Sequence, residues 1–321
     1  MSIRRGRPLF WYNRGVIKTA QKPARPESAF RIIRKRYPGL VARVQGLIED
    51  SEKAFAGNAP ESEGSFLWEH TVHVASLAFK LAEEERRDPL LAAITALFHD
   101  AGKFAGGRYH ADDTAEEAAA AGLAEPLLKR SRVPAADRES ILSALGALYK
   151  EGTGPRPLAD IVHDADFLSK FGFLGVAQFF IKSTLRGRTL RTAVMNSLSK
   201  ELTYAACLPL NMRTKAGRAM AARKSEDTLG FYAGLLTELR NVHDLDFRVE
   251  TLRLPLPDRP HRTIEIRLVL PAACAACGGK WTVRSEVVQG KKCRTLKAAV
   301  ACRGCGAAQE IAFCLPELAP R

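Results

Sequence analysis

The hydrophobic pattern of this chain changes once, near Asn241, and the change separates a helical part from a β part. Across residues 65–240 apolar side chains recur at i, i+3, i+4 and i+7, which is the period of an amphipathic helix. Residues 247–254 and 263–270 instead alternate apolar and polar side chains, a pattern typical of half-buried strands. We therefore predict a mainly α fold, in which a helical bundle is followed by a small β module.

The helical part divides into separate helices where capping residues, proline and glycine interrupt the pattern. One helix is expected to begin at Asp88 and Pro89, a cap and a first-turn proline, and to end at a corner formed by Gly102. The other helices are expected at residues 40–55, 113–123, 135–149, 158–173, 192–208 and 216–241. Further strands are expected at residues 280–287 and 295–300.

Composition divides the chain of 321 residues into five expected parts. Several prolines favour an extended arm at the start, and a stretch rich in Gly, Pro, Ser and Glu precedes the helical block. The expected parts are a basic arm at 1–37, a helix and linker at 38–64, a helical domain at 65–241, a β connector at 242–270 and a cysteine-bearing module at 271–321.

The net charge of +14 belongs to the two ends of the chain. Residues 1–36 hold eleven Lys or Arg and one acid, and residues 271–321 hold eight and three, whereas the middle is nearly neutral. Basic ends of this kind bind phosphates of RNA or DNA or other anionic surfaces, or act only as solvated arms. The sequence does not choose between a nucleic-acid or protein partner and a solvated arm.

Neither a membrane span nor a secretion signal is expected. No apolar run approaches the roughly 18 residues that a transmembrane helix needs. No apolar core follows the basic first residues, as it would in a signal peptide. We therefore expect a soluble, cytoplasmic protein without a membrane partner.

Six of the seven cysteines lie beyond residue 270 and include two CxxC knuckles, each followed by glycine. Four thiolates supplied by two such turns suit tetrahedral Zn²⁺, so a structural zinc site that resembles a zinc ribbon is expected. Cys293 and Cys314 are left over, and either one could replace a knuckle cysteine. The expected zinc ligands are Cys274, Cys277, Cys302 and Cys305.

The dipeptide His-Asp occurs at residues 99–100, 163–164 and 243–244, and only its context can distinguish the three copies. Successive helix residues diverge by about 100°, so His99 and Asp100 can face one metal ion only near a helix end. Gly102 supplies such an end for the first copy. The third copy follows the helical block without a partner and is interpreted as structural.

The first copy needs ligands from other helices, and His70 is the best upstream candidate. His70 lies on the same apolar stripe as Val74, where an unpaired polar group would be costly and metal ligation would satisfy it. A core histidine bonded to backbone is the commoner alternative. Downstream, spacing alone does not choose between Asp164 and Asp166 as the carboxylate ligand.

Three segments together resemble the HD-domain phosphohydrolase superfamily, whose pattern is H…HD…D. They are WEH at 68–70, LFHDAGK at 97–103 and ADFL at 165–168, and the resemblance covers about residues 65–240. Residues 211–221 also look like a stretch of one uncharacterised bacterial branch. The resemblance implies an HD-type helical bundle and four metal ligands, His70, His99, Asp100 and Asp166.

The resemblance also implies chemistry. A divalent ion such as Mn²⁺, Mg²⁺, Fe²⁺ or Ni²⁺ would lower the pKa of a bound water and polarise a phosphoryl oxygen. Asp100 is expected to orient that water. Lys103 is expected to neutralise phosphate charge, although it could equally act as a cation at a helix C-terminus.

Metal number and substrate contacts follow from departures within that resemblance. His110 occupies a position where two-metal members add a ligand, but residues 141–148 lack the second added histidine, which favours one metal. His110 is then a substrate or lid contact, or a surface residue. Arg213 and Arg218 could grip a substrate phosphate or lie on solvated helix faces.

We therefore predict a metal-dependent phosphohydrolase that hydrolyses a phosphate ester, with nucleotides as the first expected substrates. The zinc module is expected to act as a docking or regulatory part. The alternative is a nucleic-acid-binding or nucleotide-sensing regulatory protein with a non-catalytic HD domain.

Overall fold

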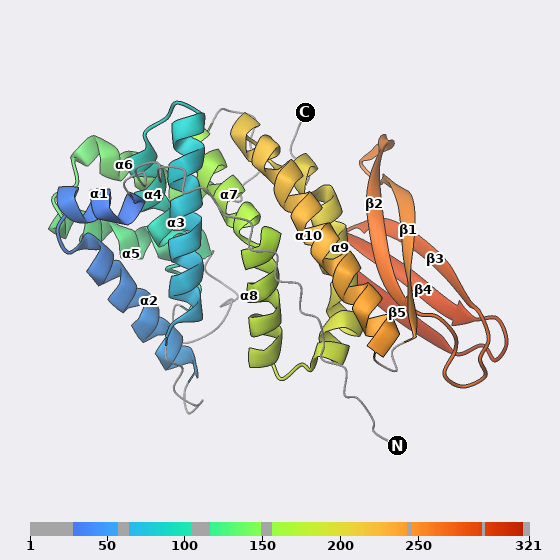
Figure 1. Cartoon of the computed structure of the whole chain (residues 1–321). Coiled ribbons are helices and arrows are strands. Elements are labelled where there is room, and N and C mark those ends of the chain that lie inside the picture. The colour runs from blue at the N-terminus through green and yellow to red at the C-terminus, as the bar shows by residue number, and fades with distance from the viewer. Residues whose placement is uncertain are drawn as a thin grey trace, which may run out of the picture.

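A computed structural model of the chain describes residues 28–56, 64–104, 116–148, 156–242, 246–290 and 293–316. Within these residues ten helices precede five strands, which confirms the predicted mainly α fold with a small C-terminal β region. Figure 1 shows the strands gathered at one end of the molecule, beyond α9 and α10. The helices are α1 (Ala29–Arg36), α2 (Leu40–Ala56), α3 (Phe66–Glu84), α4 (Pro89–Phe98), α5 (Glu116–Arg130), α6 (Ala135–Ala147), α7 (Pro157–Ser169), α8 (Gly172–Leu185), α9 (Leu190–Asn211) and α10 (Lys215–Val242).

The strands form two antiparallel sheets. Strands β1 (Phe247–Leu256) and β2 (Arg259–Pro271) make a hairpin in which Phe247 pairs with Pro271. Strands β3 (Trp281–Gln289), β4 (Arg294–Cys302) and β5 (Ala308–Cys314) follow each other in one sheet of order β3-β4-β5. Strand β5 was not expected from the sequence.

The prediction of an extended arm over residues 1–37 is wrong for its last part, because residues 29–36 form α1. Ser28 caps this helix by accepting a hydrogen bond from the Arg31 backbone N–H at 3.3 Å. Phe30 is buried and meets the ring of Trp68 edge-on, with 6.1 Å between centroids. The apolar stripe of α1 therefore belongs to the core, and the rest of the expected arm lies outside the described residues.

The helix expected at 158–173 exists as α7, but its expected end is wrong, because the chain turns after Ser169 and α8 begins at Gly172. Gly172 has a φ of +74°, a conformation that favours glycine, and its N–H donates to Thr228 Oγ1 at 2.7 Å. Helix α8 begins there and runs beside α10. The break matters for the site, because it follows directly after the end of α7.

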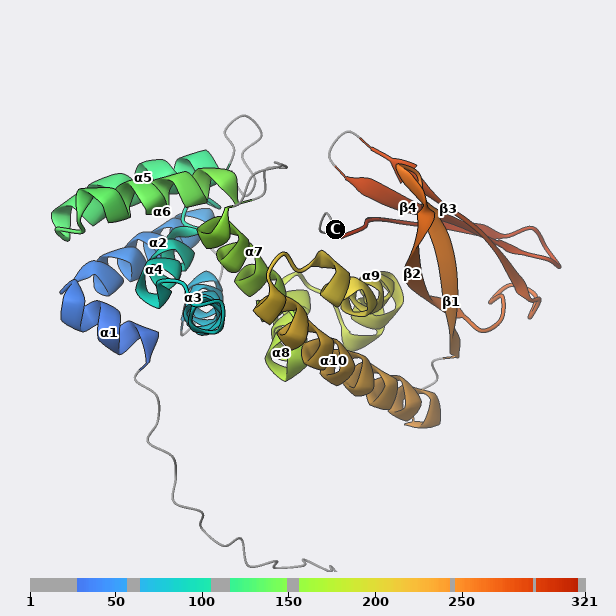
Figure 2. The same cartoon turned by 90° about the horizontal axis from the view of Figure 1, so that it is seen from above.

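The hairpin attaches the β part to the helices. Arg267 of β2 bonds through its backbone to Thr203 Oγ1 of α9, and the Val269 N–H donates to Ser199 Oγ at 2.9 Å. Apolar residues of the hairpin, such as Ile266, share one hydrophobic cluster with Leu296 of β4. The expected connector and cysteine module therefore pack as one body on α9, beside the helices in Figure 2.

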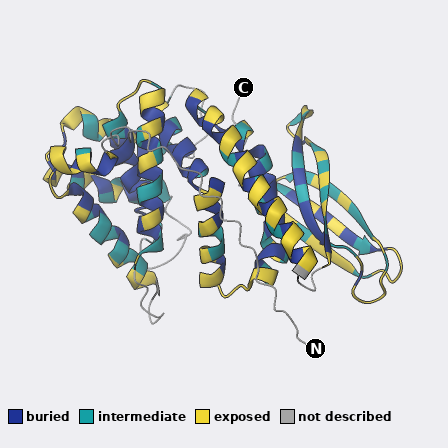
Figure 3. Ribbon diagram, viewed as in Figure 1, coloured by how far each residue is buried: buried dark blue, intermediate teal, exposed yellow. Residues whose placement is uncertain are grey.

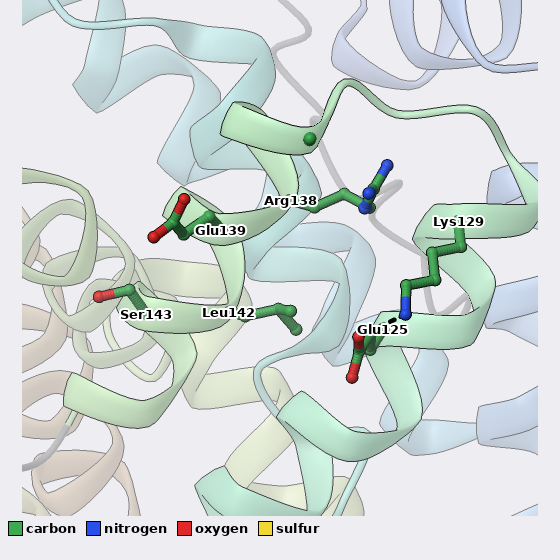
Figure 4. Close-up of a pocket in the computed structure, with 7 residues that line it drawn as sticks. Glu125, Lys129, Arg138, Glu139, Leu142 and Ser143 are labelled. Atoms are coloured by element: carbon green, nitrogen blue, oxygen red, sulfur yellow. Dashed lines mark ion pairs between the residues drawn. The ribbon is translucent and has the colours of Figure 1, made fainter.

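The main core lies among α1–α7, where apolar residues are buried on the inner faces of the helices (Figure 3). Within the described residues, no helix is long and apolar enough to cross a membrane. An open cavity of about 370 Å³ lies between α5 and α6, where Lys129 and Glu125 form an ion pair (Figure 4). None of the predicted site residues lines it.

Candidate metal centre

Two histidines from different helices meet where α4 ends. His70 comes from the second turn of α3, and His99 directly follows α4, whose N-terminus Asp88 caps as expected. Their Nε2 atoms are 3.3 Å apart, and both side chains are buried. Asp100 turns its Oδ2 to within 3.5 Å of His70 Nε2 and 3.6 Å of His99 Nε2. Candidate ligand atoms of these three residues lie within 4.8 Å of one another.

Asp166 approaches the same point from α7. Its Oδ1 lies 3.2 Å from His70 Nε2 and 3.9 Å from His99 Nε2. All four residues that the HD resemblance implies are therefore brought together, from α3, from the residues that follow α4, and from the distant helix α7.

Asp164 lies two residues earlier on α7 and serves a different part of the fold. It accepts hydrogen bonds from the backbone N–H groups of Arg213 and Thr214 at 2.9 and 2.8 Å, and from the Thr214 hydroxyl at 2.8 Å. Its Oδ1 also lies 3.0 Å from Nδ1 of His163, the neighbouring residue. The second His-Asp pair thus joins α7 to the start of α10, and Asp166 is the carboxylate that faces His70 and His99.

Both imidazoles are oriented by bonds from the nitrogen that faces away from the cluster. His99 Nδ1 lies 2.7 Å from the Ala96 carbonyl oxygen, which fixes Nδ1 as the donor. His70 Nδ1 lies 3.4 Å from Ser169 Oγ, whose own proton goes to the Asp166 carbonyl oxygen at 2.7 Å. Each Nε2 is then left as an unprotonated acceptor, which is the form of histidine that ligates metal.

The protonation states agree with that arrangement. Burial lowers the pKa of His99 below its usual value, despite the opposing effect of the nearby carboxylates. Burial alone would raise the pKa of Asp100 and Asp166, but the positive charges around them, which include Lys103 at Asp100 and Lys170 at Asp166, hold both pKa values below the usual range. Both carboxylates are therefore ionised.

Each of the two carboxylates also binds a lysine. Lys103 Nζ lies 2.6 Å from Asp100 Oδ2, and Lys170 Nζ lies 2.8 Å from Asp166 Oδ2. Lys182 of α8 carries a pKa lowered to about 8, first by burial and then by its neighbours Arg186, Lys103 and Lys170. Lys103 and Lys170 thus place an ammonium group at each ligand carboxylate, and their charges also act on Lys182.

The corner after α4 is fixed by close packing at Gly102. A Cβ at this position would lie 2.3 Å from the Glu116 carbonyl oxygen and 2.9 Å from the Ala120 backbone nitrogen. Only glycine allows the backbone after Asp100 to approach the first turn of α5 so closely.

The donor set fits a divalent ion of borderline hardness. Two imidazole nitrogens and two carboxylate oxygens suit Mn²⁺, Fe²⁺ or Ni²⁺ and accommodate Mg²⁺ less readily through the imidazoles. The four side chains are also buried and polar, and they converge on one point. Such a convergence is typical of a metal site, because a packed core avoids buried polar groups.

The remaining predicted contacts are not brought to this cluster. Arg213 Nη1 donates to the Leu148 carbonyl at 3.0 Å and lies 3.4 Å from Asp160 Oδ1. Arg218 Nη1 donates to the backbone carbonyls of Met212 and Arg213. These guanidinium groups already bind the protein, so a role in substrate contact stays a prediction. His110 and the pair at 243–244 lie outside the described residues.

The four knuckle cysteines gather at one end of the second sheet. Sγ atoms pair across the knuckles, 3.7 Å from Cys274 to Cys305 and 3.5 Å from Cys277 to Cys302. Backbone N–H groups of Cys305 and Gly304 lower the pKa of Cys302 to about 6, which favours a thiolate. All four lie within 4.8 Å of one another, as one tetrahedral ion would require.

The two cysteines left over in the sequence form a disulfide with each other. Cys293 and Cys314 are bonded, with 5.9 Å between their Cα atoms, and join the first residues of β4 to the end of β5. The knuckle set of four is therefore complete without them.

Sequence reasoning missed three residues around the histidine cluster, Ser169, Lys170 and Lys182. A signal for the first two existed, because Ser169 and Lys170 lie three and four residues after Asp166, on the same side of a helix. No signal existed for Lys182, because α8 was not expected as a separate helix.

Comparison with protein families assigns one segment of the chain. The HD domain model matches residues 67–170, about a third of the chain, and this segment contains all four clustered residues. No curated protein sequence matches the chain.

Solved structures to which the chain is similar include HD-superfamily hydrolases. An HD-superfamily hydrolase from Bacillus thuringiensis has 17% identity and a TM-score of 0.47, with 65% of this chain and 99% of that one covered. Bacillus subtilis YpgQ in complex with ADP has 18% identity and a TM-score of 0.46, with 65% and 96% covered. A predicted HD-superfamily hydrolase from an uncultured Thermotogales bacterium has 18% identity and a TM-score of 0.45, with 65% of this chain and 98% of that one covered.

Proposed function

We propose that this protein is a metal-dependent phosphohydrolase that acts on phosphate esters. The observation that carries the proposal is the convergence of two imidazole Nε2 atoms and two carboxylates from α3, the end of α4 and α7. The match of residues 67–170 to the HD domain model supports the same conclusion.

His70, His99, Asp100 and Asp166 would hold one divalent ion. When bound, that ion supplies Lewis-acid polarisation of a phosphoryl oxygen and lowers the pKa of a coordinated water. The protein contributes fixed ligands, because the Ala96 carbonyl and Ser169 orient the two imidazoles before any ion arrives.

Lysines around the cluster would receive the charge of the substrate. Lys103 and Lys170 each bind one ligand carboxylate, which places two ammonium charges beside the cluster, where a substrate phosphate would lie. Lys182 adds a third ammonium group on the α8 side. Several ammonium groups around one ion suit a substrate with more than one phosphate charge, so nucleotides are the first substrates to test.

The test is a phosphatase screen with added Mn²⁺ on wild type and Asp100→Ala, with nucleoside mono-, di- and triphosphates and a generic aryl phosphate. We expect turnover by wild type and its loss in Asp100→Ala. Arg213→Met tests separately whether the arginine predicted from the sequence as a substrate contact takes part in turnover, since its side chain already bonds the Leu148 carbonyl. Binding of ADP without turnover of any ester would favour the nucleotide-sensing alternative and overturn the enzyme proposal.

The four cysteines would hold a structural Zn²⁺ in the C-terminal sheet. The lowered pKa of Cys302 and the short distances between Sγ atoms support this assignment. Elemental analysis should then detect zinc in addition to the ion of the histidine cluster.

A further inference from the structure

Helix α8 exposes a line of large apolar side chains to solvent. Phe173, Leu174, Ile181 and Leu185 are 67%, 63%, 52% and 66% exposed. Leu174, Ile181 and Leu185 lie at i, i+7 and i+11, which brings them onto one side of the helix. These three residues form the exposed stripe of α8. Figure 3 shows the exposed residues along one side of α8 and the buried ones on the side toward α10.

The opposite side of α8 already supplies the contacts that the fold needs. Gly175, Val176 and Ser183 are buried there, and Phe179 meets the ring of Tyr232 edge-on at 6.2 Å. A helix that is apolar on both sides is normally covered on both sides. Within the part of the chain that the structure describes, nothing packs over the exposed side.

The segment that carries this stripe has charges of one sign. Residues 167–200 contain six Lys or Arg and no Asp or Glu. Asp166, just before this segment, lies in the histidine cluster, and Glu201, just after it, is partly buried. Arg186 and Arg188, at the end of α8 and in the turn that follows, are exposed beside the stripe.

We propose that the exposed side of α8 and the turn to α9 bind an anionic lipid surface peripherally. Apolar side chains of a surface helix enter the boundary between headgroups and acyl chains, while Lys and Arg beside them meet lipid phosphates. We expected no membrane partner because the sequence has no apolar run long enough to span a bilayer, but a peripheral surface contact needs no such run.

Charge distinguishes a lipid surface from two other occupants. A second copy of this chain would bring two basic, acid-free faces together, and like charges oppose such pairing. To bind an acidic helix of another protein, this chain would need to lack carboxylates only next to the stripe on α8. The segment without Asp or Glu is longer than that, because it extends from residue 167 to residue 200, through the turn and into α9.

The test is co-sedimentation of the full chain with vesicles of phosphatidylcholine alone or of phosphatidylcholine with an equal part of phosphatidylglycerol. The test variant is Ile181→Asn with Leu185→Asn, and the control is Leu210→Asn with Val249→Asn, which are exposed on α9 and β1. We expect binding to the anionic vesicles only, weakened about tenfold in the test variant and unchanged in the control. Equal thermal midpoints of the three proteins establish that each is folded.

The control is necessary because the basic ends of the chain can also attract anionic vesicles. Equal binding by wild type and test variant would assign any attraction to those ends and overturn the proposal. A wild-type dimer that becomes a monomer in the test variant, measured by light scattering, would assign the stripe to a second copy. Tight binding of a synthetic acidic amphipathic helix that vesicles do not displace would assign it to a protein partner. The readouts are independent of phosphatase activity.

Discussion

The two aspartates of α7 should separate stability from metal binding. Asp164 and Asp166 are two residues apart and both buried, yet one accepts hydrogen bonds from the start of α10 and the other faces His70 and His99. Substituting each in turn by Ala gives a matched pair in which each variant controls for the other.

In Asp164→Ala, the backbone N–H groups of Arg213 and Thr214 and the Thr214 hydroxyl lose their acceptor. Each of these three donors left without a partner costs about 1–3 kcal/mol, so the expected loss of unfolding free energy is roughly 3–9 kcal/mol. At about 2–4 °C per kcal/mol for a chain of this size class, the thermal midpoint should fall by roughly 6 °C or more. Mn²⁺ affinity at a temperature where the variant is folded should change little.

In Asp166→Ala, one ligand carboxylate and the charge partner of Lys170 are removed. Lys170 is half-exposed and can be hydrated, so the midpoint of the metal-free protein should stay within a few degrees of wild type. Mn²⁺ affinity should fall at least about tenfold, and the rise of the midpoint on adding Mn²⁺ should shrink accordingly.

The assays are calorimetric titration with Mn²⁺ and thermal unfolding in EDTA and in Mn²⁺. The reverse result, with Asp164→Ala losing metal at an unchanged midpoint and Asp166→Ala losing stability alone, would refute the assignment of the two aspartates. Loss of both properties in both variants would refute the separation of their roles.

Further predictions address other parts of the fold. Ser169→Ala should weaken Mn²⁺ binding about 10-fold or more at an unchanged thermal midpoint, because His70 loses its orienting partner; calorimetry that finds equal affinity would contradict this. Gly102→Ala should lower stability by about 1–3 kcal/mol in urea titrations, because the added Cβ meets backbone that cannot yield. Cys302→Ser should release zinc and unfold both sheets, since they share one hydrophobic cluster, and near-ultraviolet circular dichroism that is unchanged would count against it. Because the pKa of Lys182 is lowered to about 8, its charge is present below pH 8 and is lost as the pH rises above 8. The KM for a phosphate ester should therefore rise above pH 8 in wild type, and the KM of Lys182→Met should not change across the same pH range.

Local signals predicted much of the fold. The capping residue Asp88 and Pro89 gave the start of α4, and alternation gave β1 and β2 within a few residues of their ends. Strand β5 was missed because its run of seven residues alternates weakly and two of its neighbours are glycine and cysteine of a knuckle. Helix α1 was missed because prolines before and after it favoured an extended arm, while its own stripe of Phe30 and Ile33 was overlooked.

The histidine cluster could be anticipated only in part, because its specificity is tertiary. Spacing left Asp164 and Asp166 equal, since residues two apart on a helix differ by about 200° in direction and nothing in the sequence says which direction faces the site. The carboxylate of Asp164 instead accepts hydrogen bonds from the backbone N–H groups of Arg213 and Thr214, 49 and 50 residues later in the sequence. The remaining aspartate is the one that faces His70.

The break between α7 and α8 has the widest consequence for this arrangement. Had residues 158–173 formed one helix, Lys170 would continue the α7 side chains in regular order and α8 would not turn back beside α10. The left-handed turn at Gly172 instead redirects the chain directly after Lys170, so that Lys182 and the exposed stripe follow on a separate helix. A single residue with positive φ thus links the charge around the metal ligands to the apolar surface next to it, and Gly172→Ala should disturb both, with weaker Mn²⁺ binding and weaker vesicle binding measured on the same preparation.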